Sequence, residues 1–274
     1  MSDHRARKRF GQNFLVDGAV IEAIVDAIAP RAGDRIVEIG PGLAALTRAL
    51  LQRLPRQDRP LRVIEIDRDL VARLRRDFHQ DDLAIHEGDA LDVNFTALAR
   101  DAHGPLRIVG NLPYNISSPL LFHLATHVDA VVDQHFMLQR EVVERMIAEP
   151  GSSAFGRLSV MLQVRYAMEQ VLDVPPEAFD PAPKVHSAVV RMQPLARDAW
   201  GLLDAELFAR IVAAGFSQRR KMLRNTLAEY FAEVGEDTAI ALGVLPTARA
   251  EAIGVSTWVA FTNAVVRSRA AQRD

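Results

Sequence analysis

The chain of 274 residues contains no cysteine, and it has no run of about 18 or more apolar residues. The lack of cysteine excludes a disulfide scaffold, a Cys-ligated zinc site, an iron–sulfur cluster and a thiol nucleophile. The lack of a long apolar run argues against a transmembrane helix. The segment from Met1 to Phe10 is basic and has no apolar centre of the kind a secretory signal needs. We therefore expect a cytoplasmic protein that contacts no membrane.

An excess of one charge sign is also missing, because 33 Lys and Arg residues are balanced by 35 Asp and Glu residues. A chain-wide basic field is therefore excluded, and any nucleic-acid contact has to come from a local patch. The eight histidines show neither metal-ligand spacing nor an H-E-x-x-H pattern, so we expect no metal site. Nothing in the sequence requires more than a monomer.

Short apolar runs rich in β-branched residues alternate with helical patterns over the first two thirds of the chain. The predicted strands are residues 35–39, 61–66, 83–87, 106–109, 130–138 and 187–192. Strands separated by helices form a parallel sheet covered on both faces, so we predict an α/β fold. After Pro194 the pattern becomes helical, and the predicted helices are 205–215, 217–231 and 256–269. We place a domain boundary at residue 196, with residues 1–195 forming the α/β domain and 196–274 a small all-helical domain.

Glycine or polar residues lie at the carboxyl ends of four of the predicted strands, namely Gly40, Glu65, Asp89 and Asn111. Ligands of parallel sheets bind outside the carboxyl ends of the strands, where the strand order reverses. We therefore expect these four residues to converge on one edge of the sheet.

The segment from Glu38 to Ala45 lies between a strand and a helix and contains Gly40 and Gly42. Glycines at these positions permit a tight turn and a close approach of the backbone to a ligand. The spacing fits the dinucleotide fingerprint loosely, and a plain packing turn is the alternative. We favour S-adenosylmethionine over NAD, because a carboxylate at Glu38 would repel a pyrophosphate but suits an ammonium and a sulfonium group.

Two acidic residues at strand ends extend this interpretation. Glu65 is a candidate acceptor for both ribose hydroxyls, the alternative being an ordinary solvent-exposed acid at the end of a strand. Asp89 is placed to accept a hydrogen bond from an adenine amino group. Its alternative is a structural Gly-Asp turn.

The turn Asn111-Leu112-Pro113-Tyr114 is the most specific pattern in the chain. An exocyclic adenine amine is a poor nucleophile, so it has to be held by two acceptors that pull its hydrogens out of the ring plane. The Asn111 side-chain oxygen and the Leu112 carbonyl supply such acceptors, since Pro113 forces Leu112 into an extended conformation. Tyr114 is placed to stack on the base and to stabilise the developing positive charge. A plain Asn-x-Pro turn is the alternative.

Several segments together resemble the small-subunit ribosomal RNA adenine dimethyltransferases (the KsgA family). The resemblance covers most of residues 8–195 and rests on these segments: 12–15, 37–42, 63–67, 88–90, 111–117, 138–143, 155–160 and 179–187. A weaker likeness continues at 216–221. The resemblance implies a Rossmann-like methyltransferase domain, with residues 1–16 as a basic arm and cofactor lid, and a helical domain that contacts RNA or the ribosome.

The resemblance also implies a reaction and its partners. Four methyl groups would pass from S-adenosylmethionine to N6 of two adjacent adenosines near the 3′ end of 16S rRNA. The substrate would be the small (30S) ribosomal subunit or its assembly precursor, with a role late in assembly. By the same analogy Asn13, Leu15 and Ala90 join the cofactor site, and Phe179 is a second aromatic that sandwiches the target base against Tyr114.

Candidate RNA contacts lie in two basic clusters and at one further lysine. The first cluster is Arg5, Arg7, Lys8 and Arg9, and the second is Arg219, Arg220, Lys221 and Arg224, with Lys184 as the further position. We expect Arg220 and Arg224 to share a helix face at i, i+4. The alternatives are a solvated terminus for the first cluster and a charged outer helix face for the second.

Three other functions remain open from the sequence. A 23S rRNA adenine methyltransferase would share the glycine turn and the Asn-x-Pro-Tyr turn. An assembly factor would use the fold only to bind RNA, and an NAD-dependent oxidoreductase would use the glycine turn for a dinucleotide. Leu112, the segment 155–160 and the intact turn at 111–114 favour the small-subunit methyltransferase.

Overall fold

The computed structural model describes residues 13–113, 116–196 and 198–272. Their packing separates two compact units, one made of residues up to Val143 with Ala167–Pro194, the other of Glu144–Tyr166 with the chain from Leu195 onward. The predicted boundary at residue 196 had placed residues 144–166 with the sheet. They pack with the helical unit instead, because Phe155, Val160 and Val164 join its hydrophobic core.

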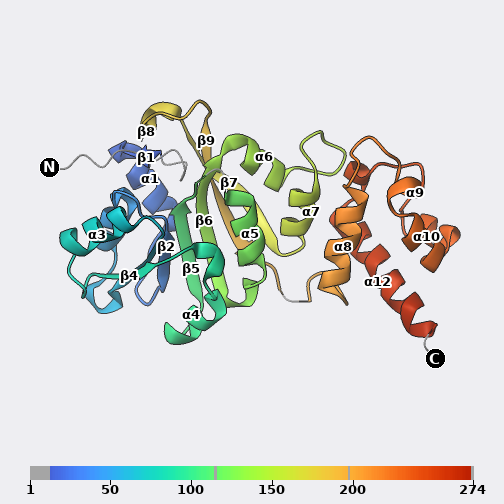
Figure 1. The fold of residues 1–274 in the computed structure, drawn as a ribbon, viewed down its shortest axis with the longest axis horizontal. Coiled ribbons are helices and arrows are strands. Elements are labelled where there is room, and N and C mark those ends of the chain that lie inside the picture. Colours follow the sequence, from blue (N-terminus) through green and yellow to red (C-terminus); the bar gives the residue numbers. More distant parts are fainter. Residues whose placement is uncertain (1–12, 114–115, 197, 273–274) are drawn as a thin grey trace. The chain divides into compact units, whose positions relative to one another are not determined.

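The first unit is built on a seven-stranded sheet in the order β4-β3-β2-β5-β6-β9-β7 (Figure 1). The strands in that order are Leu83–Glu87, Leu61–Glu65, Ile36–Ile39, Leu106–Asn111, Val131–Gln139, Ser187–Pro194 and Tyr166–Val174. The five strands from β4 to β6 are parallel, and β9 runs antiparallel to β6. From β2 the chain continues to one side through β3 and β4, and then returns to the other side with β5. The strand order therefore reverses between β2 and β5, where a ligand site is expected.

Helices cover the sheet because its strands are apolar on both faces. On one face α1 (Gly18–Ile28), α2 (Ala45–Arg53) and α3 (Arg68–Asp77) share a hydrophobic cluster with the strand residues Ile36, Val63 and Val109. Helices α4 (Phe95–Asp101) and α5 (Ser117–Ala125) lie on the viewer's side of the sheet in Figure 1. These observations confirm the α/β fold class.

Two further elements depend on local signals. The Asp17 carboxylate caps α1 by accepting hydrogen bonds from the backbone N–H groups of Ala19 and Val20. The short strand β1 (Phe14–Leu15), just before this cap, pairs antiparallel with β8 (Phe179–Asp180) in a separate two-stranded sheet. This pairing fixes the segment that leads into the site.

The second unit is helical. It contains α6 (Arg140–Ile147, from Glu144 onward) and α7 (Arg157–Gln163), together with α8 (Ala205–Gly215), α9 (Leu223–Thr226), α10 (Ala228–Val234), α11 (Glu236–Ala241) and α12 (Val255–Ala271). Its core surrounds the fully buried Trp258. Across the described parts of both units, no helix is both long enough and apolar enough to span a bilayer.

The predicted single helix over residues 217–231 is wrong. Residues 217–222 form turns, and two short helices, α9 and α10, follow. The backbone N–H groups of Leu223 and Arg224 donate to the carbonyls of Ala248 and Pro246, so tertiary hydrogen bonds replace the helical ones. Arg220 therefore lies in a turn and Arg224 on α9, and the two do not share a helical face.

Candidate functional site

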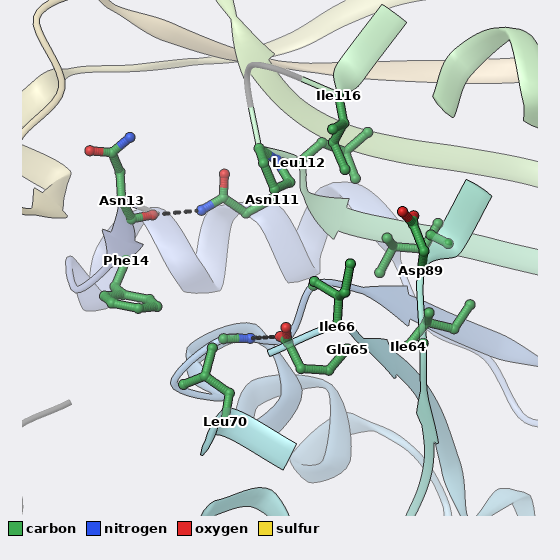
Figure 2. Close-up of a pocket in the computed structure, with 16 residues that line it drawn as sticks. Asn13, Phe14, Ile64, Glu65, Ile66, Leu70, Asp89, Asn111, Leu112 and Ile116 are labelled. Carbon is green, nitrogen blue, oxygen red and sulfur yellow. Dashed lines mark hydrogen bonds between the residues drawn. The ribbon is translucent and has the colours of Figure 1, made fainter. Parts of the chain in front are cut away.

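A cavity opens at the carboxyl ends of β2, β3 and β5, all within the first unit (Figure 2). The cavity is partly open to solvent, so a ligand can enter it from outside. The residues that line it are Asn13, Phe14, Ile39, Gly40, Gly42, Ile64, Glu65, Ile66, Leu70, Gly88, Asp89, Ala90, Asn111, Leu112, Pro113 and Ile116. The structure thus brings together the four strand-end residues predicted to converge.

The glycine turn after β2 has a backbone that other residues adopt poorly. Gly40 and Gly42 have φ angles of +68° and +56°, in the left-handed region. A Cβ on Gly42 would also lie 3.2 Å from ring carbons of Phe14. The turn is therefore both strained for other residues and closely packed, which keeps its backbone at the cavity wall.

Glu65 lies at the end of β3 and is only 5% exposed, which excludes the interpretation of a solvated strand-end acid. Its Oε1 accepts a hydrogen bond from the Asp67 N–H at 2.9 Å, and its Oε2 accepts one from the Gly42 N–H at 3.3 Å (Figure 2). Burial raises the pKa of this carboxyl. Each carboxylate oxygen has a second lone pair, so the group has room to accept two hydroxyl protons from a ligand in the cavity.

Asp89 follows β4 and combines a structural contact with a place on the cavity wall. One of its carboxylate oxygens accepts a hydrogen bond from the Leu91 N–H at 2.9 Å, which caps a short helical turn. The same side chain lines the cavity next to the buried Ala90. The turn interpretation and the ligand interpretation of Asp89 are therefore compatible.

Asn111 ends β5, and its carboxamide is oriented by a main-chain contact. Its Nδ2 donates to the Asn13 carbonyl at 3.0 Å, which directs Oδ1 away from Asn13 (Figure 2). The preceding Gly110 is required by packing, since a Cβ there would lie 2.4 Å from the Ile39 carbonyl oxygen. Close approach of β2 and β5 therefore sets the position of Asn111 beside the glycine turn.

The two residues after Asn111 are also fixed. The Leu112 N–H donates to the Met137 carbonyl at 3.1 Å, and the Leu112 side chain is 1% exposed. Pro113 lines the cavity. Tyr114, the predicted stacking residue, lies outside the described residues.

Glu38 does not line this cavity. A direct contact between its carboxylate and a cationic ligand, as predicted from the sequence, would require it to do so. Glu38 is 2% exposed, its Oε2 accepts a hydrogen bond from the Thr47 hydroxyl at 2.6 Å, and burial raises its pKa to about 7. It lines a second cavity behind the glycine turn, which shares Gly40, Gly42 and Asn111 with the first. The predicted attraction of Glu38 for an ammonium group is weakened, since the carboxyl is partly neutral near pH 7.

His135 lines the same second cavity and was not singled out from the sequence. It lies two strands from Glu38 in one row of the sheet, because Val109 is the register partner of both. Neither ring nitrogen reaches a hydrogen-bond partner among the described residues, and burial lowers the pKa to about 4. The groups that face the ring are the Ala27 carbonyl, Asp133, Arg107 and Arg191. The second cavity therefore has two buried polar groups that are close to neutral.

Phe179 and Leu15 do not line the main cavity. The predicted sandwich of the target base between Phe179 and Tyr114 stays a prediction, because Tyr114 lies outside the described residues. Leu15 and Phe179 are register partners between β1 and β8, and both are buried in the core of the first unit. Phe14, the neighbour of Leu15, points to the other face of its strand and lines the cavity instead. The sequence signal for Phe14 was its place beside Asn13, but a two-residue strand has too little alternation to show which side chain faces inward.

Apolar side chains form much of the remaining wall and were not predicted. Ile66 is 46% exposed although it follows a buried strand, and with Ile64, Leu70 and Ile116 it lines the cavity. An exposed isoleucine directly after Glu65 was the available signal. The wall therefore offers an apolar surface to a flat ring next to the acidic groups.

None of the candidate RNA contacts within the described residues is among those that line this cavity. Arg5, Arg7, Lys8 and Arg9 lie outside the described residues. Lys184 and the four residues of the second basic cluster are exposed. Arg219 is also held by its neighbours, since its Nη2 donates to the Ser153 carbonyl at 2.5 Å and its Nε lies 3.6 Å from Glu251.

Comparison with known proteins identifies this arrangement. A family model described as ribosomal RNA adenine dimethylase matches residues 3–265. A relative from Burkholderia multivorans, named ribosomal RNA small subunit methyltransferase A, is 58% identical over 270 residues, covering 98% of this chain and 97% of that protein. A protein of the same name from Bordetella avium is 58% identical over 266 residues, covering 97% of each chain.

Solved structures share the fold at lower identity. A dimethyladenosine transferase from Plasmodium falciparum has a TM-score of 0.74 at 22% identity and covers 93% of this chain and 98% of its own. The 23S rRNA methyltransferase ErmE has a TM-score of 0.69 at 24% identity, covering 93% and 100%. The fold is thus that of the Rossmann-like methyltransferases. The chain belongs to the ribosomal RNA adenine dimethylase family, as the sequence motifs had indicated.

Proposed function

We propose that this protein transfers methyl groups from S-adenosylmethionine to N6 of two adjacent adenosines near the 3′ end of 16S rRNA. Four transfers convert both adenosines to the dimethylated form. The observation that carries the proposal is the position of Asn111, whose oriented carboxamide lies in the same cavity as the buried Glu65 carboxylate. One cavity thus combines groups suited to a nucleoside cofactor with an acceptor suited to an adenine amine.

The cavity residues fit S-adenosylmethionine. When bound, this cofactor supplies an electrophilic methyl group on its sulfonium. Glu65 accepts hydrogen bonds from the two ribose hydroxyls, and Asp89 accepts one from the adenine amino group. Ile66 offers its exposed side chain to the adenine ring, while Gly40 and Gly42 let the cofactor approach the backbone closely. Asn13 and Ala90 complete the site. Leu15 and Glu38 line the second cavity, behind the glycine turn.

The target amine is activated by geometry. In the first transfer to each adenosine, the Asn111 Oδ1 and the Leu112 carbonyl accept the two amine hydrogens and turn the lone pair toward the methyl group. In the second transfer, one of these two oxygens accepts the single hydrogen that remains. With S-adenosylmethionine bound, the nitrogen–carbon bond would form as the carbon–sulfur bond breaks, and the proton on the methylated amine would leave to water. Tyr114 stacks on the base and stabilises the positive charge that develops on the nitrogen. No general base is needed in this scheme.

The small subunit is the proposed substrate, either mature or as a late assembly precursor. Support comes from relatives at 58% identity that are named for the small subunit, whereas the likeness to ErmE is one of fold alone. We propose the helical unit, with its exposed basic cluster at residues 219–224, as an RNA-contacting part of a monomeric enzyme.

The test is transfer of labelled methyl groups from S-adenosylmethionine into small subunits that lack the modification. Large subunits and naked rRNA serve as parallel substrates. We expect dimethyladenosine in small-subunit rRNA only. Label confined to the large subunit would leave the chemistry intact and contradict the target. Cofactor binding without any transfer would favour an RNA-binding assembly factor.

A further inference from the structure

The helical unit contains a groove that the proposed reaction does not use. Its walls come from the loop at 198–203 and from α10, α11 and α12. Trp200 forms one wall, and Ala260 and Ala264 of α12 form part of the floor. None of the groove residues lines the cavity of the first unit, so the groove is a separate feature of the molecule.

The loop that carries Trp200 is held in place by one buried side chain. Asn263 of α12 is 8% exposed, and its Nδ2 donates to the Gly201 carbonyl at 2.9 Å. Its Oδ1 accepts from the Leu203 N–H, also at 2.9 Å. Gly201 has a φ of +58°, which permits the bend. Because the carbonyl of Gly201 and the N–H of Leu203 are bonded to the same amide, the loop directly after Trp200 is held to α12.

The exposure of Trp200 contrasts with that of the other tryptophan. Trp258 is fully buried in the core of the unit, whereas Trp200 remains 36% exposed. Trp200 therefore leaves part of an aromatic surface accessible beside the groove, and tryptophan is enriched at binding interfaces.

The charge of the groove is of one sign. Arg267 is the single ionisable residue in its lining, and the other polar lining residues are neutral, among them Thr238 and Ser256. Arg267 is exposed and forms no ion pair within the described part of the chain. Two residues further on, Arg269 is engaged with Glu233 through bonds of 2.6 and 2.9 Å. An accessible guanidinium beside an exposed indole suits a ligand with a flat ring and an anionic group.

We propose that this groove binds an unpaired nucleotide of the RNA substrate, with the base stacked on Trp200 and a phosphate on Arg267. This inference rests on the proposed function, which supplies an RNA partner. Single-stranded RNA is held by stacking on aromatic side chains and by cationic contacts to its backbone, and the groove offers one of each. The neutral hydroxyls of Thr238 and Ser256 are suited to hydrogen bonds with sugar or base edges.

The first experiment uses intrinsic fluorescence, because the chain has two tryptophans and Trp258 is buried. The full-length protein is titrated with a single-stranded hexaadenylate as probe. We expect saturable quenching that disappears in Trp200→Phe, which keeps an aromatic surface but removes the signal. Absence of quenching in the wild type, or quenching that persists in Trp200→Phe, would overturn the inference. If the groove instead binds a protein segment or a second copy of the chain, the wild type shows no quenching by the hexaadenylate.

The second experiment measures binding to small subunits that lack the modification. We expect Trp200→Ala to weaken binding about 5- to 100-fold and Trp200→Phe to weaken it much less, as for loss of one stacked base. Leu203→Ala is the matched control, because Leu203 is an exposed apolar residue on the same loop but outside the groove lining. Wild-type affinity in Trp200→Ala would overturn the inference.

Charge is tested separately. We expect Arg267→Gln to lower the slope of log affinity against log salt by about one unit, while Arg210→Gln on α8, outside the lining, leaves it unchanged. Affinity for S-adenosylmethionine should be the same in all these variants. If the wild type methylates small subunits and Trp200→Ala binds them normally, only the groove assignment fails. If the wild type methylates no RNA, the proposed function fails whatever the groove binds.

Discussion

Both ends of the central strands in the first unit contain buried charged residues, but among the described residues only those at the amino end have partners of opposite charge. At the amino end of β5, Arg107 donates to both carboxylate oxygens of Asp133 at 2.8 Å and to Asp34 at 2.6 Å. It also donates to the carbonyls of Ile28 and Ala29, which end α1. Burial alone would lower the pKa of Arg107, and the two carboxylates outweigh it, so the pKa is raised.

At the carboxyl ends, every hydrogen bond described above for Glu38 and Glu65 has a neutral donor. Glu38 is bonded to a hydroxyl and Glu65 to backbone N–H groups, and burial raises the pKa of both. A charged group that is paired with neighbouring opposite charges stabilises the fold, and it gains little further interaction energy from a ligand. A charge that lacks a counter-ion has a free-energy cost in the empty protein, and a ligand that bonds to it relieves that cost. The comparison therefore separates the structural end of the sheet from the binding end.

The largest effect is expected at the structural end. Arg107→Met should lower the free energy of unfolding by about 3–5 kcal/mol, because the buried Asp133 and the half-buried Asp34 are left without a cation. Denaturant unfolding measures this directly. The double variant Arg107→Met with Asp133→Leu should recover part of the loss. A wild-type unfolding free energy in the single variant would contradict the contrast between the two ends.

At the binding end the corresponding change should affect activity instead. Asn111→Ala is expected to keep the fold and to lose about 10²–10³-fold in methyl-transfer rate, as for removal of a preorganised polar group. Single-turnover transfer into small subunits gives the rate, and thermal unfolding provides the control. Wild-type turnover in this variant would exclude the role of Asn111 as an acceptor.

Because burial raises the pKa of Glu38, we expect the free energy of unfolding to depend on pH. The pKa of Glu38 is about 7 in the folded protein and 4.5 as the reference value, so the protonated form is favoured by folding. Its contribution to stability is fully present below pH 4.5 and is lost as the pH rises through 7, by up to about 3 kcal/mol. Unfolding free energies of the wild type and Glu38→Gln should therefore diverge over this range. Parallel curves would show that Glu38 stays charged.

His135 provides a control of opposite sign. Its pKa falls from 6.5 to about 4 on folding, so its contribution is present above pH 6.5 and is lost as the pH falls toward 4. The difference in unfolding free energy between the wild type and His135→Gln should therefore change on the acidic side only. A change on the alkaline side would assign the titration to another group.

The smallest effect is expected in the second unit, at the exposed basic cluster. Replacing Arg220 and Arg224 by Gln should weaken binding to small subunits and flatten its salt dependence by roughly one unit for each phosphate contact. Titration at several salt concentrations measures the slope. An unchanged slope would make these residues a solvated surface rather than an RNA contact.

Much of the first unit was predictable because its strands are buried on both faces. The predicted strands at 35–39, 61–66 and 83–87 match β2, β3 and β4 to within a residue or two. Strand β7 was missed, since Tyr166–Val174 is only partly buried and includes charged residues that hide the pattern. The broken helix after residue 217 was missed for another reason. Its interruption depends on carbonyls at 246 and 248, which no local signal connects to it.

The candidate site shows the same division. Gly40, Glu65, Asp89 and Asn111 were found because each lies at or just after the end of a strand, and parallel strands end at one edge. Phe14 was missed, because its orientation depends on how β1 pairs with β8. With Leu15 and Phe179 in register, both face the core, and Phe14 is turned toward the cavity. A shift of one residue in this register would exchange the two faces.

The sequence by itself determined the alternation of strands and helices from β2 to β6, the polar residues at the strand ends and the family. These follow from local patterns of burial, from backbone freedom at glycine and from motifs that are contiguous in the chain. Only the tertiary structure decided that Glu38 bonds to Thr47, that Asn13 orients the Asn111 amide and that Arg107 is neutralised by two carboxylates. Each of these depends on residues distant in sequence or on the direction in which a side chain leaves the backbone, and both are set by packing.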